Sequence, residues 1–268
     1  MTYLVIVLAS AAAALIATPL VRRLSFALGI VALPGGRRKH EGQIPKLGGL
    51  AVFIAWLVGV VLTYWLMPPA NPDDALRLRG VVLGSFVVAA GGLLDDRYDL
   101  PPGVQFLIQL FGAFVAILHT IFIEVFTNPL PTPTLWEALP LFQIEGDLVW
   151  IWRPLALLFT VFWVVGMINA INFLDGLDGL AAGVCLIAAA FFAFHSYRLG
   201  QETVPLFPLA LAGALLGFLP FNFSPARIFL GSAGAYFLGY QMATLSILSP
   251  AKLSTALLVM AVPIIDVA

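Results

Sequence analysis

The chain has 268 residues, of which 61% are hydrophobic and only 10% are charged, and its formal net charge is −1 at pH 7. So few charges cannot solvate the surface of a soluble domain, and a mean hydropathy of +1.02 excludes the ordinary soluble classes. We therefore expect the lipid bilayer as the surroundings of the chain, and we do not expect nucleic acid as a partner.

Apolar runs between polar breaks predict the membrane spans, because a helix needs roughly 20 apolar residues to cross a bilayer. The chain contains about nine such runs, at 1–20, 47–67, 80–94, 104–126, 154–171, 180–198, 205–220, 234–249 and 253–268. The first run lacks the basic start and the cleavage pattern of a signal peptide, so we expect a retained span. The predicted fold class is all-α, a polytopic transmembrane helical bundle that forms a single domain over 1–268.

The basic residues between these runs predict the orientation. Eight of the 13 lysines and arginines fall in alternate loops on one side, and six of these eight lie in the first loop. Cytoplasmic loops carry an excess of lysine and arginine, so this side is expected to be cytoplasmic and the amino terminus to be outside. Four polar loops then share the cytoplasmic face, at 22–46, 95–103, 172–179 and 221–233.

The segment 127–153 is predicted to lie on the outer side. It is first rich in proline and then amphipathic, and Trp136, Trp150 and Trp152 fall where an interfacial aromatic belt would lie. We expect interfacial structure that serves as scaffold.

The first cytoplasmic loop contains the sequence PGGRRKHEGQIPKLGGL. Its basic run, Arg37 to Lys39, is accounted for by the positive-inside rule or by contacts with anionic lipid. Lys46 precedes Gly48 and Gly49, where the backbone can approach a ligand closely, so this lysine is a candidate for holding a phosphate.

An acidic pair, Asp95 and Asp96, follows the third run. Adjacent carboxylates raise each other's pKa unless a cation is present. Oxygen ligands without a cluster of histidine or cysteine favour Mg²⁺, or Mn²⁺, over zinc. The alternative is a solvated acidic pair at a helix end, balanced by Arg97.

Two asparagines and two aspartates fall in the stretch NAINFLDGLDGLAAG, residues 169–183, in an otherwise apolar region of the chain. Asn169 and Asp178 would lie on opposite sides of one continuous helix. A helix that ends near the first Asp-Gly and restarts near the second would bring Asp175 and Asp178 together. Polar groups in a membrane are costly and usually functional, although the two aspartates would also suit the ends of two helices.

Four motifs together resemble those of the polyprenyl-phosphate N-acetylhexosamine-1-phosphate transferase family, glycosyltransferase family 4. They are IPKLGGL, GGLLDDRYDLPP, NAINFLDGLDGLAAG and GFLPFNFSPARIFLGSAGAYFLG. The resemblance implies a Mg²⁺-dependent enzyme of the bacterial inner membrane. This enzyme would transfer a sugar-1-phosphate from a UDP-sugar to undecaprenyl phosphate at the cytosolic face and release UMP. The short connection after Asp96 is similar to the branch that uses GlcNAc-1-phosphate to begin cell-surface glycans.

The resemblance also implies roles for individual residues. The expected catalytic residues are Asp95, Asp96, Asp175 and Asp178, and the first two are also the expected metal ligands. The expected substrate-binding residues are Lys46, Gly48, Gly49, Asn169, Asn172 and Asn222. One carboxylate of the pair would bind metal or deprotonate the lipid phosphate.

The sequence departs from the family pattern in three places. Ser232 stands where the family has an aspartate that binds the metal, and Ala235 stands at the place of the family's serine. A lysine expected after the Asp-Asp loop is not evident, since Gly103 and Gln105 occupy that region. The sequence as given also stops before an expected cytoplasmic loop that contains histidine.

These departures leave other interpretations open. One is a catalytically impaired homologue that binds lipid or serves as a scaffold. Another is a membrane transporter, which would place its acidic residues near the middle of the bilayer. A homodimer is a further partner that the sequence leaves open.

Overall fold

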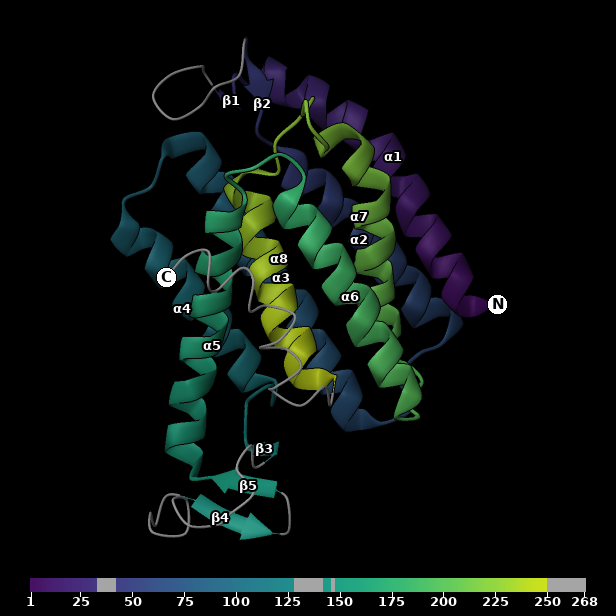
Figure 1. Ribbon diagram of the computed structural model, residues 1–268, viewed down its shortest axis with the longest axis vertical. Helices are drawn as coiled ribbons and strands as arrows, with labels where there is room; N and C mark the ends of the chain where they lie inside the picture. The colour runs from purple at the N-terminus through teal and green to yellow at the C-terminus, as the bar shows by residue number, and fades with distance from the viewer. Residues whose placement is uncertain (33–41, 128–141, 146–147, 250–268) are drawn as a thin grey trace.

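The computed structural model describes residues 1–32, 42–127, 142–145 and 148–249, and most of these residues form eight helices (Figure 1). The helices are α1 (Thr2–Ala27), α2 (Gly48–Leu66), α3 (Pro72–Tyr98), α4 (Pro102–Leu118), α5 (Arg153–Leu174), α6 (Leu180–Arg198), α7 (Leu206–Asn222) and α8 (Gly231–Leu248). The first eight predicted runs each coincide with one helix, and the ninth, 253–268, lies outside the described residues.

The helices differ in how well they suit a membrane. Five of them, α1, α2, α3, α5 and α6, are long and apolar enough to cross a bilayer. Two others, α4 and α7, are apolar but have only 17 residues each. The chain is thus a helical membrane protein, while the count of nine spans and the outward amino terminus stay predictions.

Short strands supplement the expected all-α fold. β1 (Val31–Ala32) and β2 (Ile44–Pro45) form an antiparallel pair. β3 (Val125–Thr127), β4 (Phe142–Glu145) and β5 (Leu148–Ile151) form an antiparallel sheet in the order β3-β5-β4. Strands of two to four residues are too short to produce a periodic sequence pattern, so the sequence did not predict them. β4 and β5 lie within the segment 127–153 that was predicted to be interfacial scaffold, and β3 ends at its first residue.

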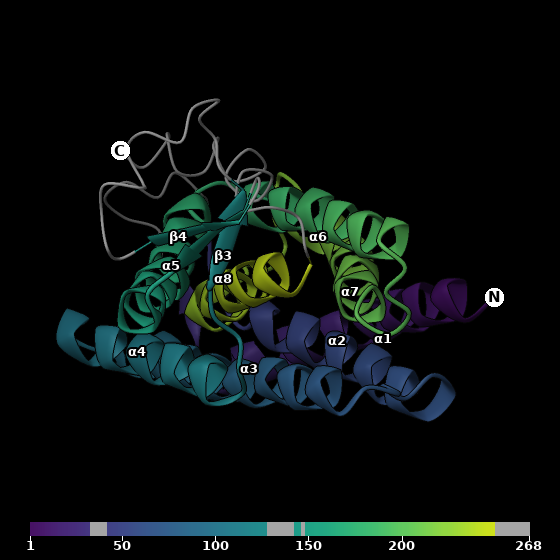
Figure 2. The same ribbon diagram turned by 90° about the horizontal axis from the view of Figure 1, so that it is seen from below.

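Helix α8 is the centre of the bundle (Figure 2). It packs against α2, α3, α5 and α6, and 15 of its 18 residues are buried. Small residues permit the close packing: a methyl group added to Gly49 would overlap the backbone of Gly234, and one added to Gly239 would overlap Ile168. The other helices therefore enclose a helix that has almost no surface of its own.

The polar loops predicted to share one face do meet at one end of the bundle. The Arg97 guanidinium donates to the carbonyl of Leu28, which joins the end of α3 to the end of α1. The Phe229 N–H donates to the Pro45 carbonyl at 2.8 Å, which joins the α7–α8 connection to β2. The sheet of β3, β4 and β5 lies at the opposite end (Figure 1).

Candidate functional site

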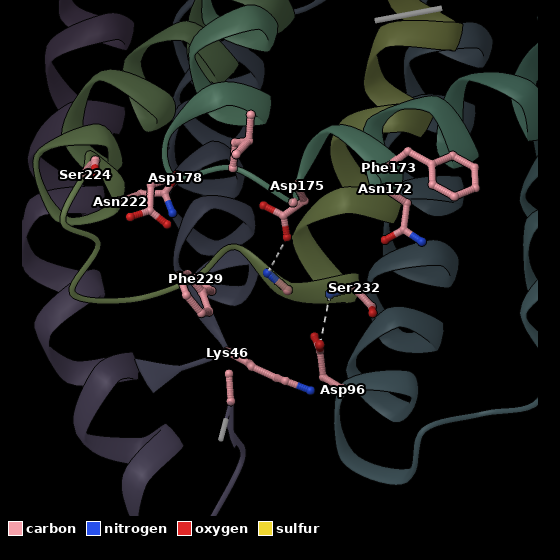
Figure 3. A pocket seen from close by; sticks show the side chains of 14 residues that line it. Lys46, Asp96, Asn172, Phe173, Asp175, Asp178, Asn222, Ser224, Phe229 and Ser232 are labelled. Carbon is pink, nitrogen blue, oxygen red and sulfur yellow. Dashed lines mark hydrogen bonds between the residues drawn. The ribbon is translucent and has the colours of Figure 1, made fainter. Parts of the chain in front are cut away.

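An open pocket of about 920 Å³ lies where these loops meet (Figure 3). Its polar side chains come from four separate segments of the chain. They are Lys46, Asp96, Asn172, Asp175, Asp178, Asn222, Ser224 and Ser232. The pocket therefore unites most of the candidate residues from the first, second, third and fourth polar loops.

Asp96 connects the end of α3 to the start of α8. One carboxylate oxygen accepts the Ser232 N–H at 2.9 Å, and the other accepts the Ala233 N–H at 3.0 Å. The first N–H groups of a helix have no partner within the helix, and the residue before α8, Leu230, provides no side-chain cap. Asp96 supplies this cap from another helix, and its negative charge suits the positive end of the α8 dipole.

Asp175 approaches the same turn from the other side. It directly follows α5 and accepts the Gly231 N–H at 3.2 Å. Burial raises the pKa of Asp175 well above its usual value, and the nearby carboxylates of Asp96 and Asp178 raise it further, while the Gly231 N–H lowers it. Two carboxylates thus share one short backbone turn, so any cation bound there would relieve their repulsion.

The interruption predicted between the two Asp-Gly pairs is confirmed. α5 ends at Leu174 and α6 begins at Leu180, with Gly179 in a left-handed conformation at φ 74°. This break turns Asp178 toward the α7–α8 connection, where it accepts the Ala226 N–H at 3.0 Å. Both aspartates therefore line the pocket, and while Asp178 holds the connection that follows α7, Asp175 holds the first residue of α8.

Two asparagines of the predicted set also line the pocket. Asn222, which is 3% exposed at the end of α7, donates to the Ile228 carbonyl at 3.0 Å. Asn172 lies near the last turn of α5, on the side of the pocket next to Ser232 (Figure 3). One asparagine holds the α7–α8 connection in shape, and the other presents its amide to the pocket.

Lys46 provides the cation of the pocket. Its backbone N–H donates to the Ile30 carbonyl at 3.2 Å, which fixes the segment before α2. Its amine points toward Asp96 (Figure 3) and lies in electrostatic contact with that carboxylate. A cation beside this carboxylate can pair with it or bind a phosphate that enters the pocket.

Gly48 and Gly49 make a close approach, but to the protein itself. Their N–H groups donate to the carbonyls of Phe229 and Leu230 at 2.9 and 2.7 Å. Neither glycine lines the pocket. In the structure they pack the start of α2 against the start of α8, while their expected contact with substrate stays a prediction.

Asp95 points away from Asp96, into the α3–α4 turn. Its carboxylate accepts the Leu100 N–H at 3.0 Å and the Gln105 side-chain amide at 2.9 Å, and it does not line the pocket. Successive residues of a helix are about 100° apart around the axis, so adjacent carboxylates need not share a target. Asp95 therefore has no contact with the pocket, and its expected catalytic and metal-binding role stays a prediction.

Asn169 also lies away from the pocket lining. Its amide donates to the side-chain oxygen of Gln109 at 2.6 Å, across the interface between α5 and α4. Gln109 is 2% exposed, and it is not among the residues predicted for the site. The available signal was its spacing of four residues from Gln105, which places both amides on one face of α4.

The residues of the pocket fit Mg²⁺ in kind. The pocket offers carboxylate, amide and hydroxyl oxygens, which are hard ligands, and Mg²⁺ is commonly held by one or two carboxylates together with water and substrate phosphates. Within the described ranges, no three His, Cys, Asp or Glu side chains are grouped closely enough to hold an ion by themselves. Ser232 contributes a neutral hydroxyl beside Asp96, so Asp96 and Asp175 are the acidic donors closest to the α8 turn.

Known proteins are similar in sequence to this chain over most of its length. A probable undecaprenyl-phosphate N-acetylglucosaminyl 1-phosphate transferase of Bacillus subtilis is 35% identical over 251 residues, which cover 94% of this chain and 64% of the relative. An undecaprenyl-phosphate alpha-N-acetylglucosaminyl 1-phosphate transferase of Haemophilus influenzae is 35% identical over 89% of this chain and 64% of the relative. A phospho-N-acetylmuramoyl-pentapeptide-transferase of Staphylococcus epidermidis is 30% identical over 84% of this chain and 68% of the relative.

The chain thus spans about two thirds of the length of these relatives, and slightly less for the first two. The family model described as glycosyl transferase family 4 matches residues 78–250, which include most of α3, all of α4 through α8 and three of the four segments that form the pocket. The chain belongs to glycosyl transferase family 4.

Proposed function

We propose that the protein transfers a sugar-1-phosphate, most simply GlcNAc-1-phosphate, from a UDP-sugar to undecaprenyl phosphate. The observation that carries this proposal is the position of the pocket. Three carboxylates and one lysine meet at the polar end of an apolar helical bundle. A soluble nucleotide-sugar and a lipid phosphate can both reach such a site, where the helices meet water.

The reaction is a phosphoryl transfer. An oxygen of the lipid phosphate attacks the β-phosphorus of the UDP-sugar, a new P–O bond forms, and the bond between the β-phosphorus and the UMP oxygen breaks. UMP leaves with the electron pair of that bond. A phosphate oxygen is already ionised near neutral pH, so positioning and neutralisation of charge provide most of the catalysis.

The described residues divide these tasks. Lys46 would bind an anionic phosphate oxygen as a point charge. Asp96 and Asp175 would hold a bound Mg²⁺, or Mn²⁺, which neutralises negative charge on the pyrophosphate when present. Asn172 and Asp178 would hydrogen-bond the nucleotide or sugar from the rim of the pocket.

The proposed surroundings follow from the same arrangement. We place the protein in the bacterial cytoplasmic membrane with the pocket toward the cytosol, where UDP-sugars are made. Basic residues Arg22, Arg23, Arg97 and Arg227 lie near the end of α1, at the end of α3 and in the α7–α8 connection, the segments that meet at the pocket, as the positive-inside rule expects of a cytoplasmic end. The transferred sugar would then begin the synthesis of a cell-surface glycan.

One observation favours a second candidate function. Ser232 offers no charge at the α8 turn, and no cluster of three metal-binding side chains is present among the described residues. A catalytically impaired homologue could still bind a lipid phosphate through Lys46. The transporter hypothesis receives less support, because Asp96, Asp175 and Asp178 lie at helix ends, away from the middle of the bundle.

A direct assay separates these possibilities. The full-length protein, purified in detergent or nanodiscs, is incubated with UDP-GlcNAc, undecaprenyl phosphate and Mg²⁺, and both UMP and the lipid product are measured. The transferase proposal requires equal amounts of the two products and no reaction without the lipid phosphate. Binding of undecaprenyl phosphate without any release of UMP, for any UDP-sugar supplied, would support the impaired homologue.

A further inference from the structure

Helix α4 contributes no residue to the lining of the pocket, yet two of its side chains hold the segments that supply the pocket carboxylates. These side chains are Gln105 and Gln109, called here the α4 glutamine pair. They are four residues apart and therefore lie one above the other on a single face of the helix.

Gln105 holds the end of α3. Its amide nitrogen donates to the carboxylate of Asp95 at 2.9 Å and to the Leu100 carbonyl at 2.8 Å. Asp95 directly precedes Asp96, whose carboxylate caps α8. The contact of Gln105 therefore fixes the last turn of the helix that carries Asp96 into the pocket.

Gln109 holds α5. Its side-chain oxygen accepts the Asn169 amide at 2.6 Å, while its amide nitrogen lies 3.4 Å from the Asn169 oxygen in the reverse direction. Asn169 lies six residues before Asp175, on the helix that Asp175 follows. The two amides face each other, so both the separation and the rotation of α4 and α5 are restricted at this point.

Tyr236 of α8 completes the surroundings of Gln109. The tyrosine is fully buried, and its hydroxyl lies close to the Gln109 amide and in electrostatic contact with Asp95 and Asp96. A displacement of Gln109 would therefore disturb its contacts with α8 as well as with α5.

Buried amides are costly in an apolar interior unless they are paired, and a leucine would pack into the same space without that cost. Hydrogen bonds between the two amides fix the relative orientation of the helices that carry them, because such bonds need a defined geometry, which apolar packing does not impose. We propose that the α4 glutamine pair is a positioning device of the transferase site, and that it aligns the carboxylates of Asp96 and Asp175 by holding α3 and α5 in register. This inference rests on the transferase activity proposed above.

The test replaces Gln109 by methionine, which has a similar length and shape but cannot form the amide pair. Misplacement of reacting groups by about 1 Å can lower the rate about 10²-fold. We expect Q109M to lower kcat by about 10-fold or more, with the KM for each substrate changed by less than about threefold. The exchange Q109N/N169Q restores an amide pair of the same total length and should recover most of kcat.

Gln241 offers a matched control. It is fully buried, and its amide donates to Ser85 at 2.7 Å between α8 and α3, with no contact to the pocket. Q241M removes a similar interhelical hydrogen bond, so it should lower the midpoint of thermal unfolding about as much as Q109M does while keeping kcat near that of the wild type.

The outcomes are distinct. Equal losses of kcat in Q109M and Q241M, at equal losses of thermal stability, would indicate that the α4 glutamine pair contributes only to the stability of the fold. This result would overturn the inference. A failure of Q109N/N169Q to recover kcat would also overturn it, because it would indicate that Asn169 contacts substrate directly. An inactive wild-type protein would instead overturn the proposed function, and this inference with it.

Discussion

The carboxylate of Asp96 accepts a hydrogen bond from the backbone N–H of Ser232, which lies 136 residues later in the chain. This bond brings the end of α3 to the first turn of α8, and Asp175 accepts the N–H of the preceding residue, Gly231. The position occupied by Ser232 is therefore the place where a further charge would affect both carboxylates most directly.

Substitution of Ser232 by aspartate should strengthen the dependence of the site on metal. A third carboxylate beside Asp96 and Asp175 would add a charged ligand, and single groups that stabilise charge alter rates about 10²- to 10³-fold. We expect Ser232→Asp to raise transferase activity, most clearly at low Mg²⁺, and Ser232→Ala to change it little. The measurement is UMP release across a series of Mg²⁺ concentrations. Loss of a robust activity in Ser232→Asp would indicate a site built without a third carboxylate.

Removal of the negative charge of Asp96 or of Asp175 should disable the reaction. Asp96→Asn keeps one acceptor for the α8 N–H groups but loses the negative charge, and Asp175→Asn does the same for Gly231. We expect each variant to lower kcat by at least about 10²-fold, because the charge that would hold the cation is lost. Near-normal turnover in both variants would rule out a catalytic role for this pair.

Asp95→Asn provides a comparison on the same helix. The variant retains an oxygen that can accept from Leu100 and Gln105, so the α3–α4 turn should persist. If Asp95 acts only through this turn, the loss of kcat should be clearly smaller than in Asp96→Asn. A loss as large as that of Asp96→Asn, with thermal stability unchanged, would instead assign Asp95 a direct part in the reaction.

Single cysteines test which side of the membrane the pocket faces, in the Cys185→Ser background so that only the new thiol can react. Asp99 and Ser224 lie at the pocket end, and Asn71 begins α3, whose other end carries Asp96. Cysteines at positions 99 and 224 should react only with reagents that enter the cytosol, and a cysteine at position 71 only with reagents outside. Labelling of positions 99 and 71 from the same side would contradict the crossing of α3.

Gly49→Ala should destabilise the bundle by overpacking. The added methyl group would overlap the backbone of Gly234, which cannot move aside as a side chain can. Overpacking of this kind typically costs about 1 to 3 kcal/mol. Gly166→Ala is the matched control, because no atom lies within 4 Å of its added methyl group. Thermal unfolding in detergent should show a lower midpoint for Gly49→Ala and little change for Gly166→Ala.

Much of the fold was accessible from the sequence, because long apolar runs leave few alternatives to membrane helices. The gathering of Lys46, Asp96, Asp175 and Asp178 in one pocket was also accessible, since polar groups at the ends of apolar runs are rarely retained without a use. The tandem Asp-Gly pairs correctly indicated a break between two helices.

Other features depended on tertiary contacts that no local pattern encodes. The direction of Asp95 is set by Leu100 and Gln105 in the following turn. The close approach expected at Gly49 is present, but its partner is the backbone of α8. Gln109 is a single polar residue in a hydrophobic run, and its role is evident only from its hydrogen bond to Asn169 on the facing helix.

The burial of α8 has a consequence for how the protein is made. With 15 of 18 residues buried, α8 presents almost no surface to lipid, and it carries the polar side chains Gln241, Thr244 and Ser246. Alone in a bilayer, such a segment would leave these groups without their partners on other helices. During biogenesis, α8 therefore gains its stability from α2, α3 and α5, which precede it in the chain. The pocket can form only after the amino-terminal turn of α8 has reached Asp96.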